Sequence, residues 1–389
     1  MSGSERVLVI GGGAIGAATA YELTRHGHDV VLLERDTDLA KDHASSTRPR
    51  AASLAAAGIL PPANLATATD PMDQLRGLSH ERFPTLAREL TELTGLDCGL
   101  NRCGGWYLAD TPGEKASMAG MIQYWRDLDI ECEEKSLDEL RRTEPELDTW
   151  CRESDGRAWW VPDEYRIHNP TYIHALRLAC MKQGADVRYD CEVTDLDESD
   201  QQVRVTVLGG KEWVADQVVV CGGAWTGLVA SRLRLAESVV PVRGQVLLIR
   251  AEHRLGAIVN LGHRYLVPRA DGNVLVGSCE EEVGFQHGTT PNGLEDLRQF
   301  VRDTCPAIAT GTEVDAWSGL RPMTFDGFPM CGKLPESDRI YVAAGHFRSG
   351  IHLSLGTARL MVEFVEGREP SIETDAFRVG KQQGSLRDG

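Results

Sequence analysis

Residues 6–16 read Arg6-Val7-Leu8-Val9-Ile10-Gly11-Gly12-Gly13-Ala14-Ile15-Gly16, a short apolar run that leads directly into a glycine-rich turn. Residues 17–26 read as a helix, residues 30–33 form a second apolar run, and Glu34 closes the segment. Strand, glycine turn, helix, strand and acid follow one another in the order that a dinucleotide-binding site requires. A carboxylate at this spacing accepts hydrogen bonds from ribose hydroxyls. The stretch therefore predicts a site for a cofactor that contains ADP.

Three glycines of this turn have separate roles. Gly11 permits the tight turn, Gly13 lets the backbone approach a pyrophosphate, and Gly16 lets the helix lie close to the strand. The amides of Ala14 and Ile15 stand at the helix N-terminus, which faces the anionic phosphates.

Length and charge restrict the class of protein. At 389 residues the chain exceeds what one hydrophobic core usually organises, so we expect two domains. The net charge of −17 argues against nucleic acid and against anionic membrane surfaces as partners. No apolar stretch approaches the ~20 residues needed to span a bilayer, and the N-terminus does not resemble a signal peptide.

The ten cysteines are scattered, contain no C-x-x-C pair, and several fall inside apolar strand-like runs. Reduced cysteines in such positions act as small hydrophobes. This usage predicts reduced thiols in a cytoplasmic protein, and the sequence predicts no metal site. A homo-oligomeric assembly stays open.

The periodicity of apolar residues predicts helices and strands in mixed order, which indicates an α/β protein with an additional β-rich region. Helices are predicted at residues 71–95, 114–128, 136–143, 169–184 and 293–303. Strands are predicted at residues 102–110, 158–162, 203–207, 217–221, 241–249, 264–268, 274–277 and 340–344.

Two further glycine turns follow predicted strands. They are Gly222-Gly223-Ala224-Trp225 and Gly345-His346-Phe347-Arg348-Ser349-Gly350. We expect the first of these strands to lie beside the N-terminal strand in a larger sheet. The small residues of 51–62 can bring the backbone close to a flat group, or can begin an alanine-rich helix.

Taken together, these motifs resemble the D-amino-acid oxidase superfamily of flavoproteins, and within it the glycine oxidase (ThiO-type) branch associated with thiamine biosynthesis. The resemblance rests on their order over nearly the whole chain. The segments that carry it are the turn at 11–16, Ala55-Ala56-Ala57-Gly58-Ile59-Leu60, Gly222-Gly223-Ala224-Trp225, Pro241-Val242-Arg243-Gly244-Gln245, Tyr265-Leu266-Val267-Pro268-Arg269, Gly319-Leu320-Arg321-Pro322 and the turn at 345–350.

The resemblance implies FAD as the cofactor and two domains that are interleaved in sequence. A Rossmann-like FAD domain would comprise residues 1–86, 155–238 and 317–389. A substrate domain built on an antiparallel sheet would comprise residues 87–154 and 239–316. Relatives that attach FAD covalently carry a cysteine about where Arg321 stands, so the FAD is expected to be non-covalent.

The resemblance also assigns roles to residues. Arg321 would bind the substrate carboxylate through its guanidinium fork, Tyr265 would donate its hydroxyl to the same group, and Arg348 would lie at the flavin or pocket edge. His263, Glu280 and Ile59 are expected at the substrate pocket. The residues expected at FAD are Gly11, Gly13, Ala14, Ile15, Gly16, Glu34, Arg35, Ser53, Ala57, Gly58, Val193, Gly222, Gly223, Trp225, Gly345, His346, Arg348, Ser349, Gly350 and Ile351.

The activity implied is oxidative deamination of glycine or another small amino acid or amine. Hydride passes from the α-carbon to flavin N5, water hydrolyses the imine, and O₂ reoxidises the flavin to give H₂O₂. Glu280 departs from the branch, where an apolar residue is usual, and predicts a preference for polar or cationic side chains. The stretch 36–50 is also longer than the branch usually has.

Three alternatives remain open at this point. One is a D-amino-acid or sarcosine-type dehydrogenase that passes electrons to an acceptor other than O₂. Another is a non-catalytic FAD-binding module, against which Arg321 and Tyr265 argue. The last is an NAD-dependent Rossmann dehydrogenase, which flavin absorbance would dismiss.

Overall fold

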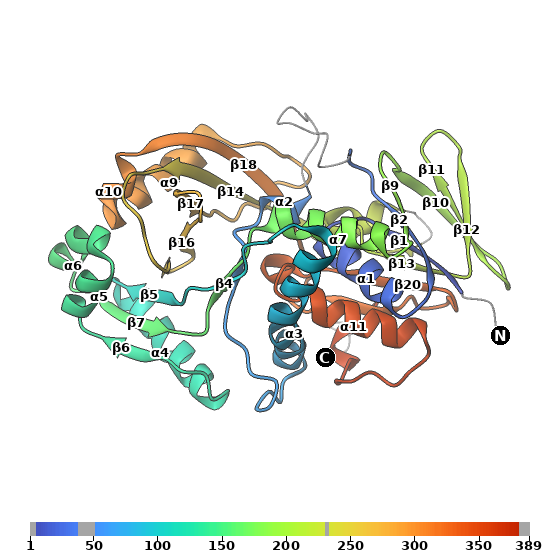
Figure 1. Cartoon of the computed structure of the whole chain (residues 1–389), viewed down its shortest axis with the longest axis horizontal. Coiled ribbons are helices and arrows are strands. Elements are labelled where there is room, and N and C mark those ends of the chain that lie inside the picture. Colours follow the sequence, from blue (N-terminus) through green and yellow to red (C-terminus); the bar gives the residue numbers. More distant parts are fainter. Residues whose placement is uncertain (1–4, 38–50, 230–232, 381–389) are drawn as a thin grey trace, which may run out of the picture.

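The computed structural model describes residues 5–37, 51–229 and 233–380. Figure 1 shows two parts side by side, one built on a mainly parallel sheet and the other on a larger, mainly antiparallel sheet. Blue, green and red segments alternate in the first part, and teal and orange segments form much of the second. The chain therefore passes between the two parts several times. Most of the long stretch at 36–50 lies outside the described residues.

The first sheet has six strands. In spatial order they are β19 (Met330–Lys333), β20 (Ile340–Ala344), β13 (Gln217–Val220), β1 (Arg6–Ile10), β2 (Asp29–Leu33) and β9 (Asp186–Arg188), all parallel except β19. The expected neighbour relation between the first strand and residues 217–221 is confirmed, because Val7 pairs with Gln217 and Ile10 with Val220.

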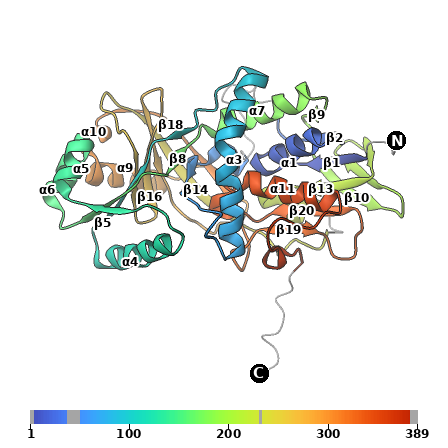
Figure 2. The same cartoon turned by 60° about the horizontal axis from the view of Figure 1, so that its bottom comes forward.

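Alternate residues of β1 pack on opposite faces of this sheet. Val7 and Val9 face a core made by four helices that contact one another in Figure 2: α1 (Ala14–Arg25), α3 (Pro71–Thr94), α7 (Asn169–Lys182) and α11 (Ser354–Val365). Leu8 and Ile10 face a three-stranded sheet of β10 (Val193–Glu198), β11 (Val203–Val207) and β12 (Glu212–Ala215). Because both faces are covered, the strand is apolar from Val7 to Ile10, and only Arg6 at its start is exposed.

The second sheet has eight strands. In spatial order they are β18 (Thr312–Met323), β14 (Val240–Arg250), β17 (Asn273–Gly277), β16 (Arg264–Pro268), β15 (Ile258–Leu261), β5 (Gly105–Ala109), β7 (Arg157–Val161) and β6 (Glu133–Lys135). All neighbouring pairs are antiparallel except β15 and β5.

Helices cover one face of this sheet, and side chains cap the starts of some of them. They are α5 (Leu137–Thr143), α6 (Asp148–Glu153), α9 (Pro291–Thr304) and α10 (Pro306–Ala309), and α4 (Pro112–Asp127) packs near the β5–β6 end. Thr111 with Glu114, and Ser136 with Glu139, form capping boxes at the starts of α4 and α5. On the opposite face, α4 packs against Tyr107 and Trp159 at the β5–β7 end, and the cavity described below borders other strands of that face.

The remaining elements are short. They are α2 (Ala52–Ala55), β3 (Ile59–Leu60), β4 (Asn101–Arg102), η1 (Pro145–Leu147), β8 (Tyr165–Arg166), η2 (Gly223–Trp225), α8 (Thr226–Val229), η4 (Phe347–Ser349) and η5 (Asp375–Phe377). The stretch of small residues at 51–62 therefore begins with one helical turn and continues as extended backbone.

The α/β fold class and the longer predicted elements are confirmed by this structure. The antiparallel sheet extends beyond the expected substrate segments, because β7 and the whole of β18 are hydrogen-bonded into it. The sheet therefore crosses the expected boundaries at residues 155 and 317, and the division into two domains stays a proposal.

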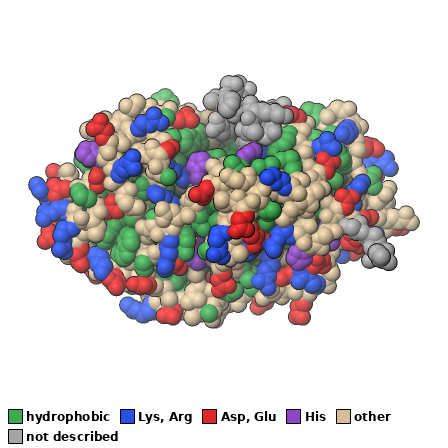
Figure 3. All heavy atoms as spheres, viewed as in Figure 1, with side chains coloured by type: hydrophobic (Ala, Val, Ile, Leu, Met, Phe, Trp, Pro, Cys, Tyr) green, Lys and Arg blue, Asp and Glu red, His purple; other side chains and the backbone are tan. Residues whose placement is uncertain are grey.

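The helices, the surface charges and the cysteines can be compared with the expectations from the sequence. No helix among the described residues is long and apolar enough to cross a membrane. On the face shown in Figure 3, acidic and basic side chains are interspersed, so the net charge of −17 is not gathered there into one patch. All ten cysteines are free thiols.

Candidate active site

The three glycine turns meet at one edge of the parallel sheet. Strands β20, β13 and β1 are adjacent and parallel, so their carboxyl ends lie side by side. The turns that follow them line a single cavity of about 560 Å³, which also borders the face of the eight-stranded sheet opposite α9 and α10. The convergence predicted from three separate motifs thus has its cause in the strand order.

The first turn is built so that its backbone, rather than side chains, faces the cavity. Gly11 has φ of +95°, and a Cβ there would lie 2.5 Å from the carbonyl oxygen of Cys221 in the neighbouring turn. A Cβ on Gly16 would overlap the carbonyl of Gly11, so α1 packs directly on the turn. Both positions therefore require glycine.

Glu34 is buried at the side of this turn and has three donors. Its Oε2 accepts from the amide of Gly12 at 2.7 Å and from Nη2 of Arg177 at 2.9 Å, and its Oε1 accepts from the amide of Asp36 at 2.9 Å. Arg177 also donates through Nε to the carbonyl of Gly12 at 2.8 Å and is 1% exposed. Arg177 was not predicted from the sequence, although an arginine within the apolar pattern of the 169–184 helix was a usable signal.

The small-residue loop lies against the same cavity and is held by polar residues from elsewhere. Ser53 Oγ accepts from the amide of Ala14 at 3.0 Å. Arg269 donates to the carbonyl of Ala57 at 2.8 Å, and Asn169 donates to the carbonyl of Ala56. Gly58 has φ of +73°, and a Cβ there would overlap the carbonyl of Ile167. The loop presents small side chains and fixed backbone to the cavity.

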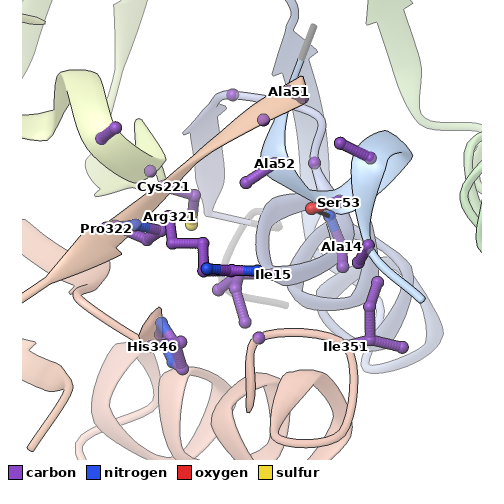
Figure 4. A pocket seen from close by; sticks show the side chains of 18 of the residues that line it. Ala14, Ile15, Ala51, Ala52, Ser53, Cys221, Arg321, Pro322, His346 and Ile351 are labelled. Carbon is purple, nitrogen blue, oxygen red and sulfur yellow. Dashed lines mark hydrogen bonds between the residues drawn. The ribbon is translucent and has the colours of Figure 1, made fainter. Parts of the chain in front are cut away.

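Arg321 enters the cavity from β18, as Figure 4 shows. Its Nη1 donates to the carbonyl of Cys279 at 2.9 Å and its Nη2 donates to Ser278 Oγ at 2.7 Å. The guanidinium lies over Gly244, where a Cβ would come within 2.5 Å of its central carbon. The fork is thus held in one orientation before any substrate binds.

Tyr265 lies next to Arg321 on the same face of the sheet. Its ring covers Gly277, where a Cβ would lie 2.5 Å from the hydroxyl oxygen. Gly277 pairs with Val246, and Val246 lies two residues along β14 from the glycine under Arg321. Gly244 and Gly277, on adjacent strands, therefore make room on one face of the sheet for a cation and a phenol.

Arg348, Glu280 and His263 lie at the border of this region. Arg348 lines the main cavity, and its Nη1 is 3.3 Å from Oε1 of Glu280. The same oxygen is 3.8 Å from Nη1 of Arg321. Glu280 and His263 line a second cavity together with Ser278 and are not among the described residues that line the main one.

His346 and Trp225 occupy fixed positions in the lining. His346 is buried and its Nε2 bonds Thr357 Oγ1 at 2.9 Å, while burial lowers its pKa to about 3, so the ring is neutral. It therefore serves as a structural residue of the turn. Trp225 stacks under the guanidinium of Arg35 at 4.3 Å, which ties the second glycine turn to the segment after Glu34.

Most of the residues predicted for cofactor and substrate line this one cavity. They are Gly11, Gly13, Ala14, Ile15, Glu34, Arg35, Ser53, Ala57, Gly58, Ile59, Val193, Gly222, Gly223, Trp225, Tyr265, Arg321, His346, Arg348, Ser349, Gly350 and Ile351. Gly16 and Gly345 stand behind it as packing glycines. Tyr107 and Asn260 also line it and were not predicted. Tyr107 lies in the strand predicted at 102–110, whereas no predicted element contained Asn260.

The lining matches an elongated dinucleotide with a flat ring at one end. Backbone and the carboxylate of Glu34 border one end, where α1 begins. Small residues 55–58 and the turn at 345–351 border the other end, below Tyr265 and Arg321. No group of three or more metal-ligating side chains is found among the described residues. The fold, with its two large sheets, and this cavity together indicate a flavin-dependent oxidoreductase.

Comparison with known proteins gives the family. The model of the FAD dependent oxidoreductase (DAO) family matches residues 6–364. The chain is similar to glycine oxidase of Geobacillus kaustophilus, with 31% identity over 382 residues and 98% of both chains covered, and to glycine oxidase of Pseudomonas aeruginosa, with 32% identity over 375 residues covering 95% of this chain and 97% of that protein. The crystal structure of the Geobacillus kaustophilus enzyme superposes with a TM-score of 0.87 at 30% identity, covering 97% of this chain and 99% of that one. The chain belongs to the FAD-dependent oxidoreductase family, and its cofactor is FAD.

Proposed function

We propose that this protein oxidatively deaminates glycine or another small amino acid, with O₂ as the electron acceptor and H₂O₂ as a product. The proposal is supported above all by the preset guanidinium of Arg321 beside Tyr265, on the wall of the cavity that faces the small-residue loop. A fork of donors fixed next to a phenol suits a carboxylate. The resemblance to glycine oxidases adds support.

In this proposal FAD would be held non-covalently and would supply the hydride acceptor for the α-carbon of the substrate. Arg321 and Tyr265 hold the substrate carboxylate, which orients the α-carbon toward the cavity interior. Glu34 and the backbone of the turn at 11–15 hold the ADP end. Bulky side chains are disfavoured because Tyr107, Asn260 and Ile59 also occupy the wall. The protein acts in the cytoplasm.

An anaerobic panel of glycine, sarcosine and D-alanine tests the proposal. Glycine or another member is expected to bleach the flavin absorbance within one turnover, and air is expected to restore it with release of one H₂O₂ per substrate. Bleaching without peroxide in air would favour a dehydrogenase with another acceptor. A flavin that no member of the panel bleaches would contradict the proposal.

Glu280 gives a prediction on substrate choice. Its carboxylate is within 3.8 Å of guanidinium nitrogens of both Arg321 and Arg348, so it offsets the positive charge with which a second substrate carboxylate would pair. We expect Glu280→Gln to raise kcat/KM for iminodiacetate relative to glycine about 10-fold, equivalent to about 1.4 kcal/mol.

The control for this measurement is Glu282→Gln, which removes the same charge from an exposed residue two positions along the chain. It should leave the ratio unchanged. An unchanged ratio in Glu280→Gln itself would show that the carboxylate does not restrict the substrate. Testing an amino acid with a cationic side chain in parallel checks the preference expected from the sequence.

A further inference from the structure

Glu164 is a fully buried carboxyl directly behind the wall of the cavity. It is 0% exposed, its Oε2 accepts from the hydroxyl of Tyr107, and its Oε1 accepts from Nδ2 of Asn260 at 3.1 Å. These two donors, a phenol and a side-chain amide, are neutral groups. A buried carboxyl with only neutral partners is costly to ionise.

The sheet register connects this carboxyl to the substrate wall. Tyr107, Asn260 and Tyr265 are direct partners across β5, β15 and β16, so the three side chains form one row on the cavity face. A Cβ on Gly105 would lie 2.7 Å from Oε2 of Glu164, so the carboxyl lies over that glycine on the same face. The row therefore begins at Glu164 and runs to Tyr265, beside Arg321.

The proposed reaction leaves one proton unassigned. An amino acid at neutral pH carries an ammonium group, and its α-carbon can lose hydride only after the nitrogen has a free electron pair. Arg321 and Tyr265 are committed to the carboxylate and are donors. A proton acceptor is needed elsewhere on the same wall.

We propose, resting on the function proposed above, that Tyr107 and Glu164 form a relay that takes this proton. One N–H proton of the substrate ammonium moves to the hydroxyl oxygen of Tyr107 while the phenol proton moves to Oε2 of Glu164. The substrate is left with a neutral amine, Tyr107 stays a phenol, and Glu164 becomes a neutral acid. After product release the same path returns the proton to water in the open cavity. Asn260 orients the carboxylate through its amide.

The surroundings set the pH at which such a relay works. Burial is the main cause that raises the pKa of Glu164 to about 7, against smaller lowering effects of the hydrogen bonds from Tyr107 and Asn260. Burial and the adjacent Glu164 raise the pKa of Tyr107 well above its usual value, so it stays protonated. The other ionisable groups nearby are Cys103, Cys132 and Arg166. The accepting form is the carboxylate, so flavin reduction should accelerate as pH rises through about 7.

Anaerobic stopped-flow reduction of the FAD-loaded enzyme by glycine, measured from pH 5.5 to 10, tests the relay. In the wild type, the rate of flavin reduction is expected to rise as the pH passes through about 7, which gives one limb of the pH profile. In Glu164→Gln and in Tyr107→Phe this limb should disappear, and the rate at pH 7 should fall about 10²-fold. Both variants should regain most of the wild-type rate at the highest pH, where the substrate amine loses its proton to water. A merely structural role would not give this recovery.

The matched control is Glu144→Gln, another buried carboxyl of the same part, which accepts from the amides of Gly256 and Ala257. It should keep the wild-type pH profile. Flavin absorbance of each variant reports whether its fold and cofactor are intact. A limb near pH 7 that persists at the wild-type rate in both Glu164→Gln and Tyr107→Phe would overturn the relay alone. A wild-type flavin that glycine, sarcosine and D-alanine all fail to reduce would overturn the proposed function, and the relay with it.

Discussion

Arg321→Lys is expected to lower kcat/KM for glycine by about 10²–10³-fold, the largest loss from a single conservative change. Charge-assisted hydrogen bonds contribute about 1.5–3 kcal/mol each, and a lysine cannot reproduce two parallel donors. The guanidinium is also positioned by Ser278 Oγ and the carbonyl of Cys279, contacts that one ammonium group cannot replace while it binds a carboxylate. Steady-state kinetics with FAD content measured in parallel checks the result.

The change should fall mainly on KM if the carboxylate is bound equally in the ground and transition states, and on kcat if its orientation limits hydride transfer. Arg298→Lys is the matched control, since Arg298 pairs with Glu313 on the exposed surface of α9. It should retain wild-type kinetics. An Arg321→Lys enzyme within threefold of the wild type would remove Arg321 from the substrate site.

Arg177→Met is expected to give a protein that binds FAD poorly and is less stable by about 3–5 kcal/mol, because it leaves the carboxylate of Glu34 buried without its cation. The arginine also holds the carbonyl of Gly12, so the glycine turn itself loses a support. The ratio of flavin to protein absorbance reports occupancy, and urea unfolding of the holoenzyme reports stability.

Adding Glu34→Gln to Arg177→Met should recover part of the stability, since the uncompensated charge is then gone. Arg82→Met provides the comparison: Arg82 joins Glu22 and Glu89 on the surface of the same helical layer and is partly exposed. It should cost about 1 kcal/mol or less and keep its FAD. Full flavin occupancy in Arg177→Met would show that the turn does not depend on this buried pair.

Much of the part of the fold that carries the glycine turns could be predicted from local sequence patterns. The order of strand, glycine turn, helix and acid at residues 6–34 predicted β1, α1 and β2, because the tight turn needs glycine and an apolar period needs only neighbouring residues. The glycine turns after β13 and β20 were identified by the same signal, with the resemblance to a known family adding their common ligand. Turns and periodicity are short-range properties, so a sequence can display them.

The tertiary structure decided everything that depends on distant pairs. Arg177 reaches Gly12 across 165 residues, and Glu164 reaches Asn260 across 96. The sequences of strands β7 and β18 do not show to which sheet the strands belong. Their hydrogen-bonding partners place them in the eight-stranded sheet. The sequence by itself predicted the cofactor-binding unit at residues 6–34 and the glycine turns that follow β13 and β20. The fixed orientation of Arg321, the row from Glu164 to Tyr265 and the buried Arg177–Glu34 pair arose only when folding brought separate segments together, because a buried polar group is defined by its partners.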